Sequence, residues 1–322
     1  MHQTKVEFGD RVWTPVTGCI ADCEYCNTRR SSKRFAGDIR MNLSRTDKYT
    51  KDGNLFILDE QFISDEGHAL STPFGFEPTY HRYSARRLET LKTPMSVLVS
   101  TTGELFGDWI DDKYIKEVFD ETAKYPEQRF LFQTRFPERY YKLANEGKLR
   151  QADNCWYGWT VVGGSLHHPP FEAPHKYIVL EPLLGPVEPE VPEDIEWIVI
   201  GADTGKYRGQ VKPKWEWIEA LVEQCYKQSI PVWMLDTIKG IVPEDQFRKE
   251  KPAVMTERKF SRTNELRFCV NCRVCGVRGQ KGKSICVTFK HGRKGRLTIV
   301  GYLCTECAKN MCKDYNLDDL EE

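Results

Sequence analysis

The sequence predicts an α/β protein built on a parallel sheet or barrel. Short, strongly apolar segments rich in β-branched and aromatic residues recur along the chain, as expected of buried parallel strands. Segments with a helical pattern lie between them, and each strand with its helix takes roughly 20 to 30 residues. Such alternation is typical of repeated βα units, which form parallel sheets or barrels.

The predicted strands are, in order, 96–100, 130–133, 156–162, 177–181, 197–201 and 231–235. The predicted helices between them are 112–125, 137–147 and 213–228. Several strands end in polar or glycine-containing turns, such as TTGE after the first of them. Because ligands of parallel α/β proteins bind beyond the carboxyl ends of the strands, these turns are expected to line the site.

The alternation of strands and helices is interrupted twice. Residues 27–93 are polar and are predicted to be an irregular insertion or lid, with a helix near 83–91. Near 246–265 the pattern fades into a basic linker. The sequence therefore predicts a barrel domain over 1–245 and a small, metal-bound, β-rich module over 266–322.

Composition limits the class of protein. The 322 residues are 40% hydrophobic and 29% charged, and no apolar run approaches the roughly 18 residues of a membrane span. With no signal-peptide pattern at the start, a cytoplasmic location is expected, where twelve cysteines indicate metal binding more than disulfides. The net charge is zero, but residues 248–296 carry fifteen Lys/Arg against three Glu.

Three cysteines lie close together near the start, in the sequence CIADCEYC. Cys19, Cys23 and Cys26 have the spacing C-x3-C-x2-C, whereas a zinc site usually needs a second cysteine pair. Three thiolates suit a loop around a cubane 4Fe-4S cluster, in which one iron is left open. A purely structural cluster and a zinc site are the alternatives.

This spacing, with an aromatic residue at Tyr25, resembles the signature of the radical S-adenosylmethionine superfamily. The resemblance implies a cluster in the loop after the first strand of a partial or complete βα barrel. It also implies S-adenosylmethionine on the open iron and an electron donor such as flavodoxin or ferredoxin. Reductive cleavage of the cofactor would give a 5′-deoxyadenosyl radical that abstracts hydrogen from a substrate.

A narrower resemblance covers residues 12–235. The motifs VWTPVTGC, STTGELFGDW, FQTRFPER, EPLLGP and WIVIGADTG occur in the same order as in a phage-associated branch of radical-SAM-like proteins. That branch supplies no function to carry over. The chemistry following radical formation therefore stays open.

The superfamily resemblance also implies roles for the strand-end residues. The turn Thr102-Gly103-Glu104 corresponds to a Gly-Gly-Glu-like turn that receives the methionine amino group, with threonine in place of the first glycine. The alternative for Glu104 is an exposed turn carboxylate.

Further cofactor contacts are expected from the next strands. Gln133, Thr134 and Arg135 are expected to reach the ribose or carboxylate of the cofactor, unless Arg135 forms a surface ion pair. Gly201 would let backbone approach the adenine, although a tight turn needs the same residue.

Carboxylates at strand ends are candidates for catalysis. Glu181 ends an apolar strand, and a carboxylate there is expected to pair with a ligand or a cation such as arginine. The same argument, in weaker form, makes Asp108 a second catalytic candidate and Asp203 a cofactor contact.

The second cysteine group predicts a zinc ribbon. Two C-x2-C pairs separated by 28 residues supply four thiolates, Cys272, Cys275, Cys304 and Cys307. The intervening ICVTFK and LTIVGYL are expected to form a hairpin. Cys269 with Cys272 is an alternative first pair, and a second iron–sulfur cluster is an alternative metal centre.

These features together predict a radical S-adenosylmethionine enzyme acting on a nucleic acid or a nucleotide-derived substrate. The basic C-terminal module would contact phosphates, or it would simply be a solvated basic surface. One alternative is the same chemistry on a peptide or protein. Another is a non-catalytic nucleic-acid-binding protein that retains the fold.

Overall fold

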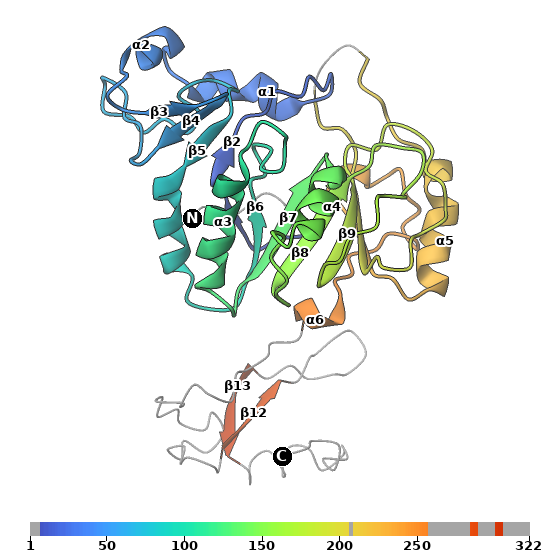
Figure 1. Cartoon of the computed structure of the whole chain (residues 1–322). Helices are drawn as coiled ribbons and strands as arrows, with labels where there is room; N and C mark the ends of the chain where they lie inside the picture. Colours follow the sequence, from blue (N-terminus) through green and yellow to red (C-terminus); the bar gives the residue numbers. More distant parts are fainter. Residues whose placement is uncertain (1–6, 206–208, 257–283, 289–299, 305–322) are drawn as a thin grey trace. The chain divides into compact units, whose positions relative to one another are not determined.

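The computed structural model describes residues 7–205, 209–256, 284–288 and 300–304 (Figure 1). The chain divides into two compact units, Met1–Arg258 and Lys259–Glu322. The first unit contains, in chain order, β1 Arg11–Trp13, β2 Val16–Thr17, α1 Asn27–Ser32, η1 Lys33–Phe35, α2 Ile39–Ser44, β3 Thr50–Asp52, β4 Leu55–Leu58, β5 Thr79–His81, η2 Arg82–Thr90, β6 Ser96–Val99, α3 Asp112–Ala123, β7 Arg129–Thr134, α4 Pro137–Asn145, β8 Cys155–Thr160, β9 His175–Leu180, β10 Trp197–Ile200, η3 Trp215–Trp217, α5 Glu219–Lys227, β11 Val232–Met234, η4 Asp236–Ile238 and α6 Ala253–Thr256.

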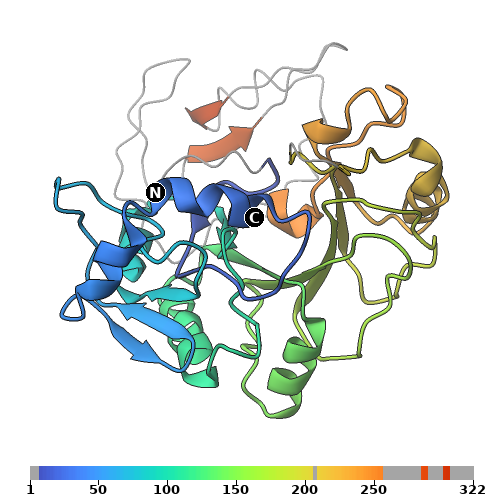
Figure 2. The same ribbon diagram turned by 90° about the horizontal axis from the view of Figure 1, so that it is seen from above.

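The main sheet has seven strands in the order β1-β6-β7-β8-β9-β10-β11, and every neighbouring pair is parallel. The order in the sheet follows the order in the chain, so successive crossovers proceed in one direction. The sheet stays open between β1 and β11 and forms a half-barrel, with α3, α4 and α5 around its outer side (Figure 2). The predicted α/β class and parallel sheet are confirmed, and all six predicted strands belong to it.

The two faces of the sheet bury different clusters because side chains alternate along each strand. The outer face packs against α3, α4 and α5 in the largest core cluster. The inner face forms a separate cluster around Leu98, Leu131, Trp156, Tyr177 and Val199. Further along four of these strands the inward positions are polar: Ser100 and Gln133 lie two residues after Leu98 and Leu131, and Thr160 and Glu181 lie four residues after Trp156 and Tyr177. The alternation thus carries an apolar inner face into a polar carboxyl edge.

The sequence predicts an irregular insertion over 27–93, but this stretch contains α1, η1, α2 and the strands β3, β4 and β5. These three strands join β2 in a second sheet with the order β2-β5-β4-β3. A small core of Phe56, Leu58, Phe62, Leu70 and Phe74 supports this sheet, with the rings of Phe56 and Phe74 stacked at 4.1 Å. The expected helix near 83–91 is the 3-10 helix η2. The strands of the second sheet are too short to show a periodic hydrophobic pattern in the sequence, so this sheet is defined by the pairing between its strands.

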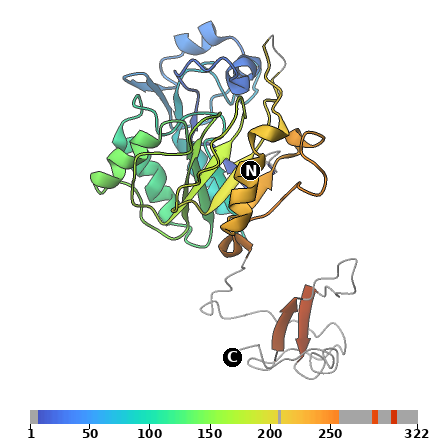
Figure 3. The ribbon, with the colours of Figure 1, turned by 90° about the vertical axis from the view of Figure 1, so that its right-hand side faces the viewer.

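In the second unit, β12 (Ser284–Thr288) pairs antiparallel with β13 (Val300–Cys304), which confirms the predicted hairpin (Figure 3). In this register Cys304 lies opposite Ser284. Three of the expected zinc ligands, Cys272, Cys275 and Cys307, lie outside the described residues, as do residues 257–265 of the expected linker. Within the described ranges, no helix is both long and apolar enough to cross a membrane.

Candidate functional site

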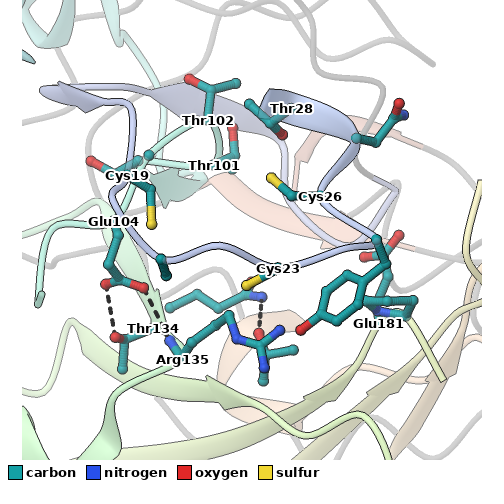
Figure 4. A pocket seen from close by; sticks show the side chains of 18 of the residues that line it. Cys19, Cys23, Cys26, Thr28, Thr101, Thr102, Glu104, Thr134, Arg135 and Glu181 are labelled. Atoms are coloured by element: carbon teal, nitrogen blue, oxygen red, sulfur yellow. Dashed lines mark hydrogen bonds between the residues drawn. The ribbon is translucent and has the colours of Figure 1, made fainter. Parts of the chain in front are cut away.

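A cavity of about 390 Å³ lies at the carboxyl edge of the half-barrel (Figure 4). Its walls come from the cysteine loop, the start of α1 and the ends of β6 to β10. The structure brings together eleven of the expected site residues in this lining: Cys19, Cys23, Tyr25, Cys26, Gly103, Glu104, Gln133, Thr134, Arg135, Glu181 and Asp203. Its size falls in the range of small-molecule sites.

The cysteine loop is held by the chain itself and not by a disulfide. All three cysteines are free thiols, and Cys26 is the N-cap of α1, where its Sγ accepts a hydrogen bond from Arg29 N at 3.3 Å. The Arg29 guanidinium donates to the carbonyls of Cys19 (3.1 Å) and Ala21 (2.5 Å). Burial raises the pKa of the Cys19 thiol to about 12, so binding a metal there must displace a proton.

Two glycines let the cysteine loop and the turn after β6 approach closely. Gly18 has φ +79°, and a Cβ there would lie 2.3 Å from the Glu77 carbonyl oxygen. A Cβ on Gly103 would lie 2.6 Å from the Val16 carbonyl oxygen. The turn is joined to the loop by hydrogen bonds from Gly18 N to Thr102 O and from Glu104 N to Gly18 O. Gly103 thus sets the position of the neighbouring carboxylate relative to the cysteines.

Glu104 is buried, not the exposed turn carboxylate considered as its alternative. Its carboxylate accepts hydrogen bonds from Thr134 Oγ1 (2.8 Å), Phe106 N (2.9 Å) and Arg135 N (3.1 Å). Burial raises its pKa, while these bonds oppose the rise. A carboxylate has about four acceptor positions, so about one remains for a donor in the cavity.

Arg135 does not form the surface ion pair considered for it. Its guanidinium carbon lies 5.0 Å from the centre of the Tyr25 ring. Arg135 Nη1 and the Tyr25 hydroxyl are both buried, and neither has a hydrogen-bond partner among the described residues. Buried polar atoms are nearly always paired, so these two atoms are available to hydrogen-bond a ligand in the cavity. Gln133, by contrast, already donates to Thr160 Oγ1 at 2.9 Å.

The expected arginine partner of Glu181 is not found within the described part of the chain. The carboxylate lines the cavity, and no ion pair or hydrogen bond joins it to another described residue. Burial, with a smaller effect of the Glu7 charge, raises its pKa to about 7. Gly201 lies behind it and outside the lining, where a Cβ would be 3.3 Å from Glu181 Cγ. Near neutral pH this carboxyl can therefore hold or release a proton.

The two other expected carboxylates, Asp203 and Asp108, lie in different environments. Asp203 lines the cavity, but its Oδ1 accepts a hydrogen bond from Gly205 N at 2.7 Å and so forms a turn. Asp108 lies outside the lining; its side chain is 95% exposed, with Arg139 at 3.8 Å. The turn after β6 directs it to solvent, and it is not part of the site. Sequence reasoning missed Arg29 and Thr160, for which no motif gives a signal.

Three free thiols around one cavity are a donor set that a 4Fe-4S cluster can take. Within the described residues, no three His, Cys, Asp or Glu side chains converge closely enough to hold one metal ion. In a cubane cluster each thiolate binds a different iron, so the three sulfurs need only surround the cluster. Three free thiols that face one cavity meet this requirement (Figure 4).

Comparison with known proteins gives one family and distant structural likenesses. No curated protein matches significantly. A spore photoproduct lyase variant with bound AdoMet and dinucleoside spore photoproduct matches at 11% identity and a TM-score of 0.34, over 97% of this chain and 73% of that one. Another variant of that lyase matches at 12% identity and a TM-score of 0.33, with the same coverage. Residues 3–257 match the model described as a protein of unknown function (DUF5131), and the chain therefore belongs to the DUF5131 family.

Proposed function

We propose that this protein is a radical S-adenosylmethionine enzyme whose 4Fe-4S cluster is held by Cys19, Cys23 and Cys26. The observation that carries the proposal is that these three free thiols share one cavity with Glu104 and Arg135. When bound, the reduced cluster and its cofactor supply a 5′-deoxyadenosyl radical. An electron donor of the flavodoxin or ferredoxin type would reduce the cluster.

The side chains of this cavity have distinct roles in the proposal. The remaining acceptor position of Glu104 would receive an ammonium group, and the unpaired Nη1 of Arg135 would bind an anionic or hydroxyl oxygen. Tyr25 holds the Arg135 guanidinium in place through its ring. These contacts would orient the amino-acid end of S-adenosylmethionine.

Glu181 is suited to act on the substrate. It comes from the inner face of the sheet, has no partner among the described residues, and would hold a proton at its carboxyl group near neutral pH. The apolar inner face beneath it, with Leu98 and Leu131, would exclude water from the reacting atoms. This environment limits quenching of a radical by side reactions.

The proposed substrate is a nucleic acid or a nucleotide-derived molecule. Residues 273–296 of the C-terminal module carry eight Lys/Arg and no Asp or Glu, which supports phosphate binding by this module. We also propose that Cys272, Cys275, Cys304 and Cys307 bind zinc around the β12–β13 hairpin. Zinc would then stabilise a unit too small for a large core.

Electron paramagnetic resonance on reconstituted, dithionite-reduced protein tests the proposal. We expect a reduced 4Fe-4S signal that changes when S-adenosylmethionine is added, followed by formation of 5′-deoxyadenosine. A fully populated cluster that neither responds to S-adenosylmethionine nor yields 5′-deoxyadenosine would contradict enzymatic function and favour a non-catalytic binding protein. Hydrogen abstraction from a peptide, but not from an oligonucleotide, would replace the proposed substrate class.

A further inference from the structure

The segment after the cysteine loop carries a basic surface at the mouth of the cavity. Between Asn27 and Arg45 the chain has a single acidic residue, Asp38, against six Lys/Arg. This segment forms α1, η1 and α2, which lie at the top of the first unit in Figure 1. Asn27 and Thr28 line the cavity, so the basic segment begins at its edge.

Three cations of this segment have no acidic partner. Lys33, Arg34 and Arg40 are exposed, and no ion pair joins them to any carboxylate within the described ranges. Cations elsewhere on this unit are often neutralised, as where Lys148 contacts both Asp112 and Glu146. Uncompensated charges of one sign create a positive potential that attracts a polyanion.

Apolar side chains lie among these cations. Phe35 is 59% exposed and directly follows Lys33 and Arg34, and Met41, 51% exposed, directly follows Arg40. Exposed aromatic rings between cations are the arrangement that binds single-stranded nucleic acid, because the cations contact phosphates and the ring stacks on a base.

The dimensions of this surface suit a single strand. Phe35 follows Thr28 by seven residues, which corresponds to about 10 Å along a helix at 1.5 Å per residue. One strand of a duplex carries a phosphate about every 3.4 Å of its axis, and an unstacked single strand is more extended, so this length covers at most about three phosphates. The base next to them would reach the edge of the cavity.

We propose that Lys33, Arg34, Phe35 and Arg40, here called the rim surface, bind single-stranded or locally opened nucleic acid and direct one nucleotide into the cavity. The choice of substrate class rests on the proposed function, and the rim surface adds the place where the barrel unit holds that substrate. A paired base inside a duplex cannot enter a cavity of about 390 Å³, so the target nucleotide must be unpaired or turned out of the stack.

The test measures how tightly the full-length, cluster-loaded protein binds labelled 20-nucleotide single-stranded DNA and RNA. Fluorescence anisotropy gives the affinity at several salt concentrations. The variant carries Lys33→Gln, Arg34→Gln and Arg40→Gln together. We expect an affinity at least about tenfold weaker at low salt. The slope of log K against log salt should fall by about 2, because each single-strand phosphate contact contributes about 0.7.

Two further variants separate the contributions. A matched control carries Arg86→Gln, Arg87→Gln and Lys92→Gln, which removes the same charge from exposed positions on and just after η2, and its binding should change little. Phe35→Ala should weaken binding by about tenfold without changing the salt slope, because it removes stacking and not a phosphate contact. Unchanged iron content would show that each variant keeps its cluster.

Several outcomes would overturn the rim surface. The unaltered protein would fail to bind oligonucleotides, or the rim variant would bind them as tightly as the unaltered protein. Equal losses of oligonucleotide affinity in the rim variant and in the control would also overturn it. Slower cluster reduction by an acidic flavodoxin, with oligonucleotide binding unchanged, would assign the surface to an electron donor instead. Binding needs no turnover. Salt-dependent rim binding without any 5′-deoxyadenosine formation would therefore contradict the proposed function alone.

Discussion

The guanidinium of Arg135 lies over the ring of Tyr25, with 5.0 Å between the guanidinium carbon and the ring centre. This contact joins the end of β7 to the cysteine loop, two segments more than a hundred residues apart. Each side chain also contributes a buried polar atom that lacks a partner among the described residues. The pair thus positions an unused hydrogen-bond donor toward the cavity.

Replacing Arg135 by Ala should weaken binding of S-adenosylmethionine to the cluster-loaded protein by roughly tenfold to a hundredfold. A hydrogen bond to a charged group is worth about 1.5–3 kcal/mol, and the variant removes it. Calorimetric titration gives the affinity, with the exposed Arg86→Ala on η2 as control. An unchanged affinity in Arg135→Ala would exclude this residue from the cofactor site.

Replacing Cys23 by Ala should abolish the N-terminal cluster, because two thiolates cannot hold it in place. The readout is the paramagnetic signal that responds to S-adenosylmethionine, which separates this cluster from any metal bound at the C-terminal cysteines. Ile20→Ala changes an exposed residue of the same loop, 47% accessible, and should keep the signal. A complete, responsive cluster in Cys23→Ala would refute the ligand assignment.

Replacing Gly103 by Ala should destabilise the first unit by about 1–3 kcal/mol, the usual cost of overpacking. The new Cβ would meet the backbone of β2, at 2.6 Å from Val16 O and 2.7 Å from Thr17 Cα, and a backbone cannot move aside as a side chain can. Urea denaturation measures the loss. Gly185→Ala is the control, because nothing lies within 4 Å of its Cβ, and equal stability of the two variants would contradict the steric argument.

Glu181 should make stability depend on pH. Its pKa is raised to about 7, above the value near 4.3 of an unfolded chain, so the folded state binds the extra proton between these values. The contribution of Glu181 is therefore complete below about pH 4.3 and is lost as pH rises through 7. Compared with Glu181→Gln, the unaltered protein should lose roughly 4 kcal/mol of unfolding free energy over that window.

Urea denaturation of both proteins between pH 5 and pH 8 checks this expectation, and most of the change should fall in that interval. Asp108→Asn, at an exposed position outside the cavity, is the control and should show no comparable trend. A constant difference between Glu181→Gln and the unaltered protein would mean that the carboxyl stays ionised throughout.

Replacing Cys304 by Ala should release zinc from the C-terminal unit and loosen it, because the proposed site needs all four thiolates. Metal analysis of the purified protein gives the zinc content. Cys286→Ala changes a cysteine on β12 of the same hairpin that is not among the proposed ligands, so it should retain zinc. Zinc retained in Cys304→Ala and lost in Cys286→Ala would require a different set of zinc ligands.

The sequence by itself determined the parallel sheet, because buried strands such as Tyr177–Leu180 have an apolar, β-rich composition that no neighbouring segment alters. The sequence also determined the spacing of the three cysteines, because this spacing belongs to one short segment of the chain. Strand ends in a parallel sheet share one edge, so the motif residues at the ends of β6 and β7 were expected to meet, and they line one cavity.

Only the tertiary structure decided which side chains have partners. Glu104 is buried because Thr134 and the Arg135 amide, both at the end of β7, surround it together with the nearby Phe106 amide, whereas Asp108 at the same strand end faces solvent. The second sheet formed by β2 to β5 likewise depends on pairing between short strands that have no pattern of their own. Burial and pairing are properties of contacts across the fold, and no local stretch of sequence contains them.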